Sequence, residues 1–144
     1  LKKGISKSKI EKGLSEDIYG IEYDEPQYKK CIKNLDRIVK EYQLKKVMWK
    51  NIKNEDALSN LFEEKFDYVV GNPPYIKYKA LSLGDREYIR KNFETCKKGK
   101  FDYCYAFIES SIKSLKNNGK MAYLIPSSIF KNVFAIFPIC VLLN

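Results

Sequence analysis

The residues with the clearest chemical potential lie between Phe66 and Tyr75, where the sequence reads Phe-Asp-Tyr-Val-Val-Gly-Asn-Pro-Pro-Tyr. The first part is rich in aromatic and β-branched residues, which favour a buried parallel strand. The strand must end at Pro73 and Pro74, because proline has no backbone N–H and keeps the residue before it out of the helical conformation. Asn72 should therefore lie on a stiff loop at the carboxyl end of a strand, where open α/β sheets bind ligands.

This loop carries two hydrogen-bond acceptors and an aromatic ring. Asn72 supplies an amide oxygen, and the backbone carbonyl of Pro73 has no helix or sheet partner that the sequence requires. Two neighbouring acceptors can take both hydrogens of an exocyclic amino group, and Tyr75 offers a flat face on which a ring can stack. The alternative is a proline-rich turn that only ends the strand, but four consecutive motif residues are more specific than Asn-Pro alone.

The Asn-Pro-Pro-Tyr string resembles the catalytic motif of S-adenosylmethionine-dependent amino-methyltransferases, most closely that of the N6-adenine DNA methyltransferases of restriction–modification systems. The resemblance implies that Asn72 and the Pro73 carbonyl hold the adenine amino group, that Pro74 completes the catalytic motif, and that Tyr75 stacks on the base. It also implies base flipping, because an in-line methyl donor cannot reach an amino group inside a duplex.

Two acidic residues upstream are candidate cofactor ligands. Glu22 closes a short strand expected over 17–22, and an acidic residue at such a position holds the ribose in nucleotide-binding sheets. The resemblance implies that Glu22 contacts the ribose of S-adenosylmethionine, that Asp56 contacts its adenine, and that Asn72 also borders the cofactor. The alternative for Glu22 is a helix-dipole or capping role. An N-cap role for Asp56 is compatible with cofactor binding, because both place a carboxylate at a strand-to-helix turn.

Basic and aromatic residues alternate just after the motif, and a basic turn follows at Lys97–Lys100. This pattern suits phosphate contact combined with base stacking, so Lys77 and Tyr78 are predicted to contact the substrate together with Tyr75. A solvated basic loop is the alternative. Phe134 lies where the resembled family often carries an aromatic residue that packs against the flipped base, and a core aromatic is the alternative there.

The composition agrees with at most one domain, for which a polyanion is a natural partner. The chain has 144 residues and a net charge of +9, which favours a nucleic acid as partner. Its four cysteines contain no Cys-x-x-Cys pair and no histidine occurs, so we predict no metal site. Cys31 and Cys104 fall on apolar helical positions and are expected to be reduced core residues. No signal peptide is evident, and the apolar tail is too short to span a membrane, so a cytoplasmic location is expected.

Helices and strands alternate along the chain, which predicts a parallel, doubly wound sheet. The helix expected over 25–43 begins at Asp24 and carries an apolar stripe; Asp102 should cap a later helix, which Asn117-Asn118-Gly119 would stop. The remaining expected elements are strands at 46–50, 66–71 and 120–125 and helices at 57–62, 85–93, 102–116 and from Pro126 onward.

The fold class that the resemblance implies is α/β, a partial Rossmann-like class I methyltransferase fold whose mostly parallel sheet lacks its first, central strand. The family places a Gly-rich cofactor loop after that strand, whereas Gly4 and Gly13 are isolated here. We therefore expect residues 1–135 to form a partial catalytic domain that is inactive alone, and residues 136–144 to be a divergent or truncated tail. Expected partners are DNA and either a missing N-terminal segment or a specificity or restriction subunit.

The expected function is methyl transfer from S-adenosylmethionine to the N6 amino group of adenine in DNA. A protein-glutamine or RNA amino-methyltransferase is the enzymatic alternative, because an amide or a guanine amino group fits the same acceptors. The aromatic and basic residues after Pro74 favour DNA. A non-catalytic nucleic-acid-binding remnant is the alternative from another class, since the glycine loop is absent.

Overall fold

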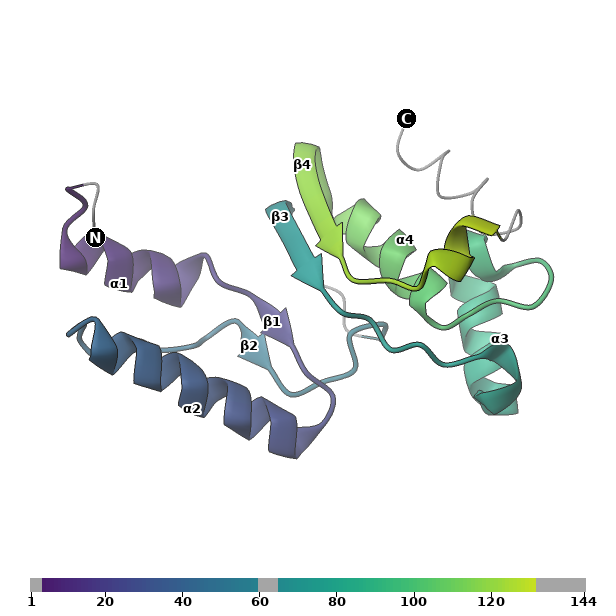
Figure 1. Cartoon of the computed structure of the whole chain (residues 1–144), viewed down its shortest axis with the longest axis horizontal. Helices are drawn as coiled ribbons and strands as arrows, with labels where there is room; N and C mark the ends of the chain where they lie inside the picture. The colour runs from purple at the N-terminus through teal and green to yellow at the C-terminus, as the bar shows by residue number, and fades with distance from the viewer. Residues whose placement is uncertain (1–3, 60–64, 132–144) are drawn as a thin grey trace. The chain divides into compact units, whose positions relative to one another are not determined.

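The computed structural model of the chain describes residues 4–59 and 65–131. Internal contacts divide the chain into two compact units, Leu1–Asn60 and Leu61–Asn144. The first contains α1 (Lys7–Glu16), β1 (Gly20–Ile21), α2 (Glu25–Glu41) and β2 (Ile52–Lys53) (Figure 1). The second contains β3 (Phe66–Gly71), α3 (Leu83–Asn92), α4 (Cys104–Ser114), β4 (Leu115–Tyr123) and three 3₁₀ turns, η1 (Tyr78–Ala80), η2 (Glu94–Cys96) and η3 (Ser127–Lys131). The domain limits 1–135 and 136–144 stay predictions, and the tail lies outside the described residues.

The first unit is a strand–helix–strand arrangement. Its two short strands are parallel, with Gly20 paired to Ile52 and Ile21 to Lys53. Because α2 lies between them in the chain, the unit has the crossover connection that parallel strands require. The strand predicted over 17–22 is thus present, although only Gly20 and Ile21 are paired as a strand.

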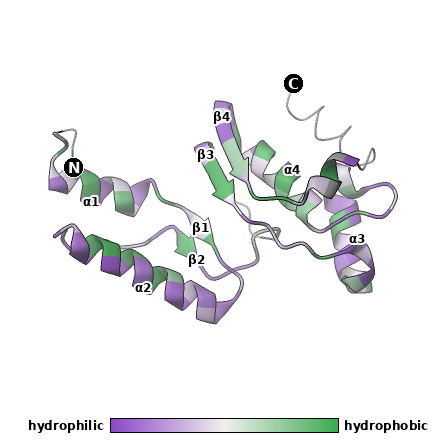
Figure 2. Ribbon diagram, viewed as in Figure 1, coloured by the Kyte–Doolittle hydropathy of each residue, from purple (hydrophilic) through white to green (hydrophobic). Residues whose placement is uncertain are grey.

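Helix α2 begins where the sequence predicts. Asp24 is its N-cap and accepts a hydrogen bond from the Gln27 N–H at 2.9 Å, and Pro26 lies in the first turn, where its missing N–H costs nothing. The helix ends at Glu41, two residues before its predicted end. Figure 2 shows apolar and polar residues alternating along it, as an amphipathic helix requires.

The strand predicted over 46–50 is wrong, because β2 begins only at Ile52. In the earlier segment Val47 is buried, and the Trp49 indole N–H donates to the Asp36 carboxylate of α2 at 2.9 Å. That segment therefore packs against the helix, and the chain reaches β1 only at Asn51, whose carbonyl accepts the Gly20 N–H at 3.0 Å.

The apolar stripe of α2 is covered less than the sequence predicts. Val39 is its one fully buried residue, and Cys31 is exposed, so the prediction of a core cysteine at position 31 is wrong. Two short strands are too small to cover a helix of 17 residues. Cys104 in the second unit is buried, as predicted. Of the helix predicted over 57–62, the described part is a turn, and the rest lies outside the described residues.

The second unit is built on a parallel pair, β3 with β4. The strand predicted over 66–71 is confirmed, and its main ladder runs from Tyr68 opposite Lys120 to Gly71 opposite Tyr123. Parallel pairs between helices agree with the predicted α/β class; the Rossmann-like strand order stays a prediction.

Strand β4 starts earlier than the sequence predicts, directly after α4. The expected helix stop, 117–119, instead forms an irregularity inside the strand, where the register shifts and Asn118 has φ 66°. A Cβ atom on Gly119 would lie 2.9 Å from the Phe66 carbonyl oxygen, so the close approach of the two strands requires glycine there.

Helix α4 covers one face of this pair and supplies much of the core. Its Cys104, Tyr105, Ala106 and Ile108 are buried, and the Ser111 hydroxyl lies 2.5 Å from that of Tyr123 on β4. On the other face Tyr68 and Val70 are 72% and 78% exposed. The buried strand that the sequence predicts is therefore covered on one face only within the described residues.

The prediction that Asp102 caps the following helix is wrong. The N-cap of α4 is Tyr103, which makes no side-chain capping bond. The Asp102 carboxylate accepts a hydrogen bond from the Lys77 ammonium group at 2.7 Å instead, and the two residues form an antiparallel bridge. The partner comes from 25 residues upstream, so the local sequence pattern could not reveal it.

A buried carboxylate joins α4 to the turn that precedes it. Glu109 is fully buried, accepts the Thr95 N–H at 2.8 Å and pairs with the Lys113 ammonium group at 2.6 Å. Burial alone would raise the pKa of Glu109, but the hydrogen bonds from Lys113 and from the Thr95 and Glu94 N–H groups outweigh it and lower the pKa below its ordinary value.

The ionised Glu109 carboxylate should therefore stabilise the fold above its unfolded-state pKa of about 4.3, and this contribution should be lost as the pH falls through the lower folded-state pKa. We expect Glu109→Gln to reduce the free energy of unfolding by about 1–3 kcal/mol at neutral pH. The difference from the unaltered chain should shrink below about pH 4. Urea unfolding at the two pH values measures it. Glu87→Gln on the exposed side of α3 is the matched control, and equal losses in both variants would contradict the assignment.

Candidate active site

The proline-rich loop leaves β3 at Gly71 and places Asn72 at the carboxyl end of a parallel strand, as predicted. The Leu124 N–H donates to the Gly71 carbonyl at 3.1 Å, so β4 supports the loop from the side. A Cβ atom on Gly71 would lie 2.8 Å from the Tyr123 ring, which explains the glycine before the motif. Pro73 is buried, whereas Asn72 and Pro74 are exposed, so Pro73 anchors the loop and the amide stays accessible.

The side chains of Asn72 and Tyr75 lie against each other. The Tyr75 hydroxyl oxygen is 2.5 Å from the Asn72 amide oxygen and 2.5 Å from the Leu124 carbonyl oxygen. A hydroxyl has one hydrogen, so it donates to one of these acceptors at a time. An amide oxygen has two lone pairs, and Asn72 therefore keeps acceptor capacity beyond the tyrosine contact. Sequence reasoning brought these two residues together but did not reveal this bond.

The residues after the motif are held by contacts from other segments. Lys77 pairs with Asp102, and this hydrogen bond raises the pKa of the lysine above its ordinary value. The Arg86 guanidinium lies over the Tyr78 ring, 4.6 Å from its centroid, and the Tyr78 and Phe101 rings pack edge-to-face with their centroids 5.1 Å apart. Both side chains are thus engaged inside the unit, and their contact with a substrate stays a prediction. Phe134 lies outside the described residues.

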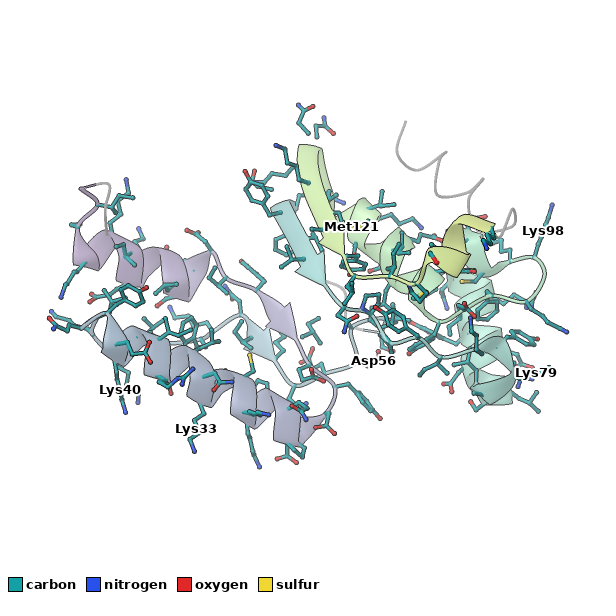
Figure 3. The ribbon with its side chains drawn as sticks, viewed as in Figure 1. Lys33, Lys40, Asp56, Lys79, Lys98 and Met121 are labelled. Carbon is teal, nitrogen blue, oxygen red and sulfur yellow. The ribbon has the colours of Figure 1, made fainter. Side chains whose placement is uncertain are left out.

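The two acidic candidates lie in the first unit. Glu22 follows β1, and its carboxylate accepts the Asp24 N–H at 3.0 Å. Asp56, labelled in Figure 3, accepts the Leu58 N–H at 3.0 Å and the Ser59 hydroxyl at 2.6 Å, so its carboxylate closes the turn at 57–59; the N-cap role for a helix stays a prediction. Both follow the carboxyl ends of the parallel strands β1 and β2, so the structure brings these two carboxylates to the same end of one sheet.

Sequence reasoning missed Asn54. Its side-chain N–H₂ donates to the carbonyl oxygens of Glu22, at 2.7 Å, and Tyr23, at 2.9 Å. This amide ties the end of β1 to the end of β2 and fixes the turns that carry both acidic residues. The available signal was an asparagine between a strand and an acidic residue. Its two acceptors are 32 and 31 residues away in the sequence, so the local pattern does not identify them.

Comparison with protein families matches residues 5–136 to the Eco57I restriction-modification methylase family. The chain belongs to this family. The match covers the parallel strands, the proline-rich loop and both acidic candidates. It places the chain among the methyltransferases of restriction–modification systems.

Individual relatives agree with the family. The chain is 36% identical over 86 residues to the type II methyltransferase M.AccI of Acinetobacter calcoaceticus, and the aligned region covers 57% of this chain and 15% of the relative. It is 33% identical over 87 residues to the type II restriction enzyme and methyltransferase RM.Eco57I of Escherichia coli, covering 56% of this chain and 9% of the relative.

A third relative is the putative type II restriction enzyme and methyltransferase RM.MjaORFECS2P of Methanocaldococcus jannaschii. It is 39% identical over 100 residues, which is 69% of this chain and 8% of the relative. The chain thus spans less than a sixth of the length of each of these three proteins. Within residues 4–59 and 65–131 of this family member, no helix is long and apolar enough to cross a membrane.

Proposed function

We propose that the chain carries the acceptor site of an N6-adenine DNA methyltransferase that uses S-adenosylmethionine. The observation that carries this proposal is the Asn72 amide, exposed on a proline-stiffened loop at the end of β3, next to Tyr75. Membership in a restriction–modification methylase family supports DNA as the substrate. DNA is therefore the proposed partner, with a specificity or restriction subunit as a further one.

The donor set of the first unit suits the nucleoside part of S-adenosylmethionine. Ribose hydroxyls and the adenine amino group are hydrogen-bond donors, and Glu22 and Asp56 are acceptors. One carboxylate oxygen of Glu22 receives the Asp24 N–H, and the other receives no hydrogen bond within the described residues. Each carboxylate oxygen of Asp56 accepts one bond and keeps further lone-pair capacity. When bound, S-adenosylmethionine would supply an electrophilic methyl group on a sulfonium.

The role of Asn72 and Pro73 is to hold and orient the attacking nitrogen. The Asn72 amide oxygen and the Pro73 carbonyl oxygen would each accept one N–H of the adenine amino group. Positive charge would grow on the nitrogen as it accepts the methyl group, and two fixed acceptors would stabilise that charge. The surplus proton then leaves to solvent. Tyr75 would stack on the base, with its hydroxyl giving up its bond to Asn72.

The alternatives have less support. A protein-glutamine or RNA amino-methyltransferase could use the same acceptors, but the relatives are type II methyltransferases, two of them also named as restriction enzymes. A non-catalytic nucleic-acid-binding remnant would need no exposed amide at the end of β3. Product analysis separates these possibilities.

In a protein containing these residues, Asn72→Ala should lower the rate of methyl transfer by on the order of 10²–10³-fold or more. A loss of this size is typical when one preorganised electrostatic contact is removed. Affinity for S-adenosylmethionine should stay within a few fold, because the nucleoside ligands are elsewhere. Single-turnover transfer to duplex DNA, with mass spectrometry of the nucleosides, measures both the rate and the product. Asn92→Ala on α3 is the control. Near-normal transfer by the Asn72 variant, or methylated cytosine as product, would contradict the proposal.

Tyr75→Phe keeps the ring and removes the hydroxyl that lies on the Asn72 oxygen, so methyl transfer should stay within a few fold of the unaltered protein. Tyr75→Ala removes the ring and should cost about 1–3 kcal/mol of base stacking, which appears as a loss of roughly 5–150-fold in kcat/KM. The same single-turnover measurement compares the two. If both variants lose activity equally, the hydroxyl rather than the ring is the functional group.

A further inference from the structure

Arg86 of α3 fastens the segment Lys77–Lys79, here called the first basic segment. Its Nε donates to the Tyr78 carbonyl at 3.0 Å, and its Nη2 donates to the Lys79 carbonyl at 3.0 Å. The same guanidinium lies over the Tyr78 ring. Arg86 therefore holds the first basic segment through two of the segment's backbone carbonyl groups and through the Tyr78 ring.

Arg90, one helical turn later, fastens Lys97–Lys100, the second basic segment. Its Nη1 donates to the Lys97 carbonyl at 2.9 Å, and its Nη2 donates to the Gly99 carbonyl at 3.1 Å. Gly99 has φ 68°, a left-handed conformation that glycine adopts without strain and that lets the turn close around the guanidinium. The guanidinium also lies 5.5 Å from the Phe101 ring centroid.

The two basic segments are thus held by two arginines that contact the same aromatic ring. Both guanidinium groups lie over the Tyr78 ring, which also packs edge-to-face on Phe101. A planar guanidinium presents donors in a fixed fork, so it can hold two carbonyl groups at once, which a lysine ammonium group does less well. The arginines hold backbone carbonyls, and the surrounding lysines are available for other contacts.

The lysines of these segments differ in their partners. Lys77 pairs with Asp102, and Lys97 pairs with Glu94. Within the described residues no carboxylate pairs with the other three, which are Lys79, Lys98 and Lys100. All three are exposed, and Lys79 and Lys98 are labelled in Figure 3. The two basic segments therefore present three ammonium groups that have no carboxylate partner within the described residues. The two arginines hold the backbones of these segments in place.

We propose that Lys79, Lys98 and Lys100 form a contact surface for the phosphates of duplex DNA, with Arg86 and Arg90 as its positioning residues. Exposed ammonium groups on an ordered backbone neutralise phosphates and release counterions without reading bases. Because the arginines order the segments beforehand, binding loses less conformational freedom. The surface begins four residues after Tyr75, so it suits the backbone beside a flipped base. This inference rests on the proposed function for its choice of DNA.

The first experiment measures binding of the chain to a fluorescent duplex of about 20 base pairs across a range of salt concentrations. Each phosphate contact contributes about 0.9 to the slope of log affinity against log salt, so the triple variant Lys79→Gln, Lys98→Gln, Lys100→Gln should lower the slope by roughly 2–3. The loss should be equal for two unrelated sequences. The control is Lys30→Gln, Lys33→Gln, Lys40→Gln on α2, which removes the same charge and should change the slope by less than about one.

Several results would overturn the inference. They are an equal loss in the two triple variants, an unchanged slope in the first, no binding to duplex DNA at all, or a greater affinity for duplex RNA of the same length. The measurement does not depend on methyl transfer. If a protein containing these residues forms no N6-methyladenine but DNA binding depends on the three lysines, the proposed function fails and the phosphate-contact surface stands; the converse result overturns only the surface.

The positioning role is tested at Arg90. Arg90→Lys keeps the charge but cannot hold both carbonyl groups, so it should weaken DNA binding about as much as Arg90→Gln does. Amide hydrogen exchange at residues 98–100 should rise in both variants, while circular dichroism stays unchanged. Full rescue of affinity by lysine would show that Arg90 contacts phosphate directly and would overturn its positioning role. If both variants unfold, the surface lysine variants still test the contact surface.

Discussion

The pairing of β3 with β4 is the interaction on which the candidate active site depends. The parallel ladder from Tyr68 opposite Lys120 to Gly71 opposite Tyr123 fixes where β3 ends, and the Leu124 N–H then holds the Gly71 carbonyl. The proline-rich loop has few backbone donors of its own, since two of its residues lack an N–H. Its position must therefore come from the neighbouring strand and from the burial of Pro73.

Charged groups of the second unit divide into two kinds. Glu109, Asp102 and the two arginines of α3 are directed inward, where they bind backbone groups or lysines from other segments. Such contacts order the turns between helices, because these turns have little apolar surface to bury. Several exposed lysines are left without a carboxylate partner within the described residues. The basic residues behind the net charge of +9 thus include arginines that hold backbone carbonyl groups within the unit. They also include the exposed lysines proposed to contact an anionic partner.

Local signals predicted the elements whose limits depend on local chemistry. Asp24 and Pro26 set the start of α2, and the residue types of 66–71 with the following prolines set β3 and the placement of Asn72. Glu22 could be proposed because it closes a strand, and Asp56 because the family resemblance implies it. Signals failed where the outcome required a distant partner: the 46–50 segment packs on α2, and Asp102 pairs with Lys77.

The sequence by itself determined the family resemblance, the strand that ends at Gly71, the proline-stiffened loop and the amide and ring that it carries. These follow from backbone restrictions on neighbouring residues, which operate within a few positions. Only the tertiary structure decided that the Tyr75 hydroxyl lies on the Asn72 oxygen, that Asn54 ties the Glu22 turn, and that two arginines join the basic segments. Most of these bonds reach beyond their own element, to carbonyl oxygens or groups that any sequence offers, so residue types alone cannot identify them.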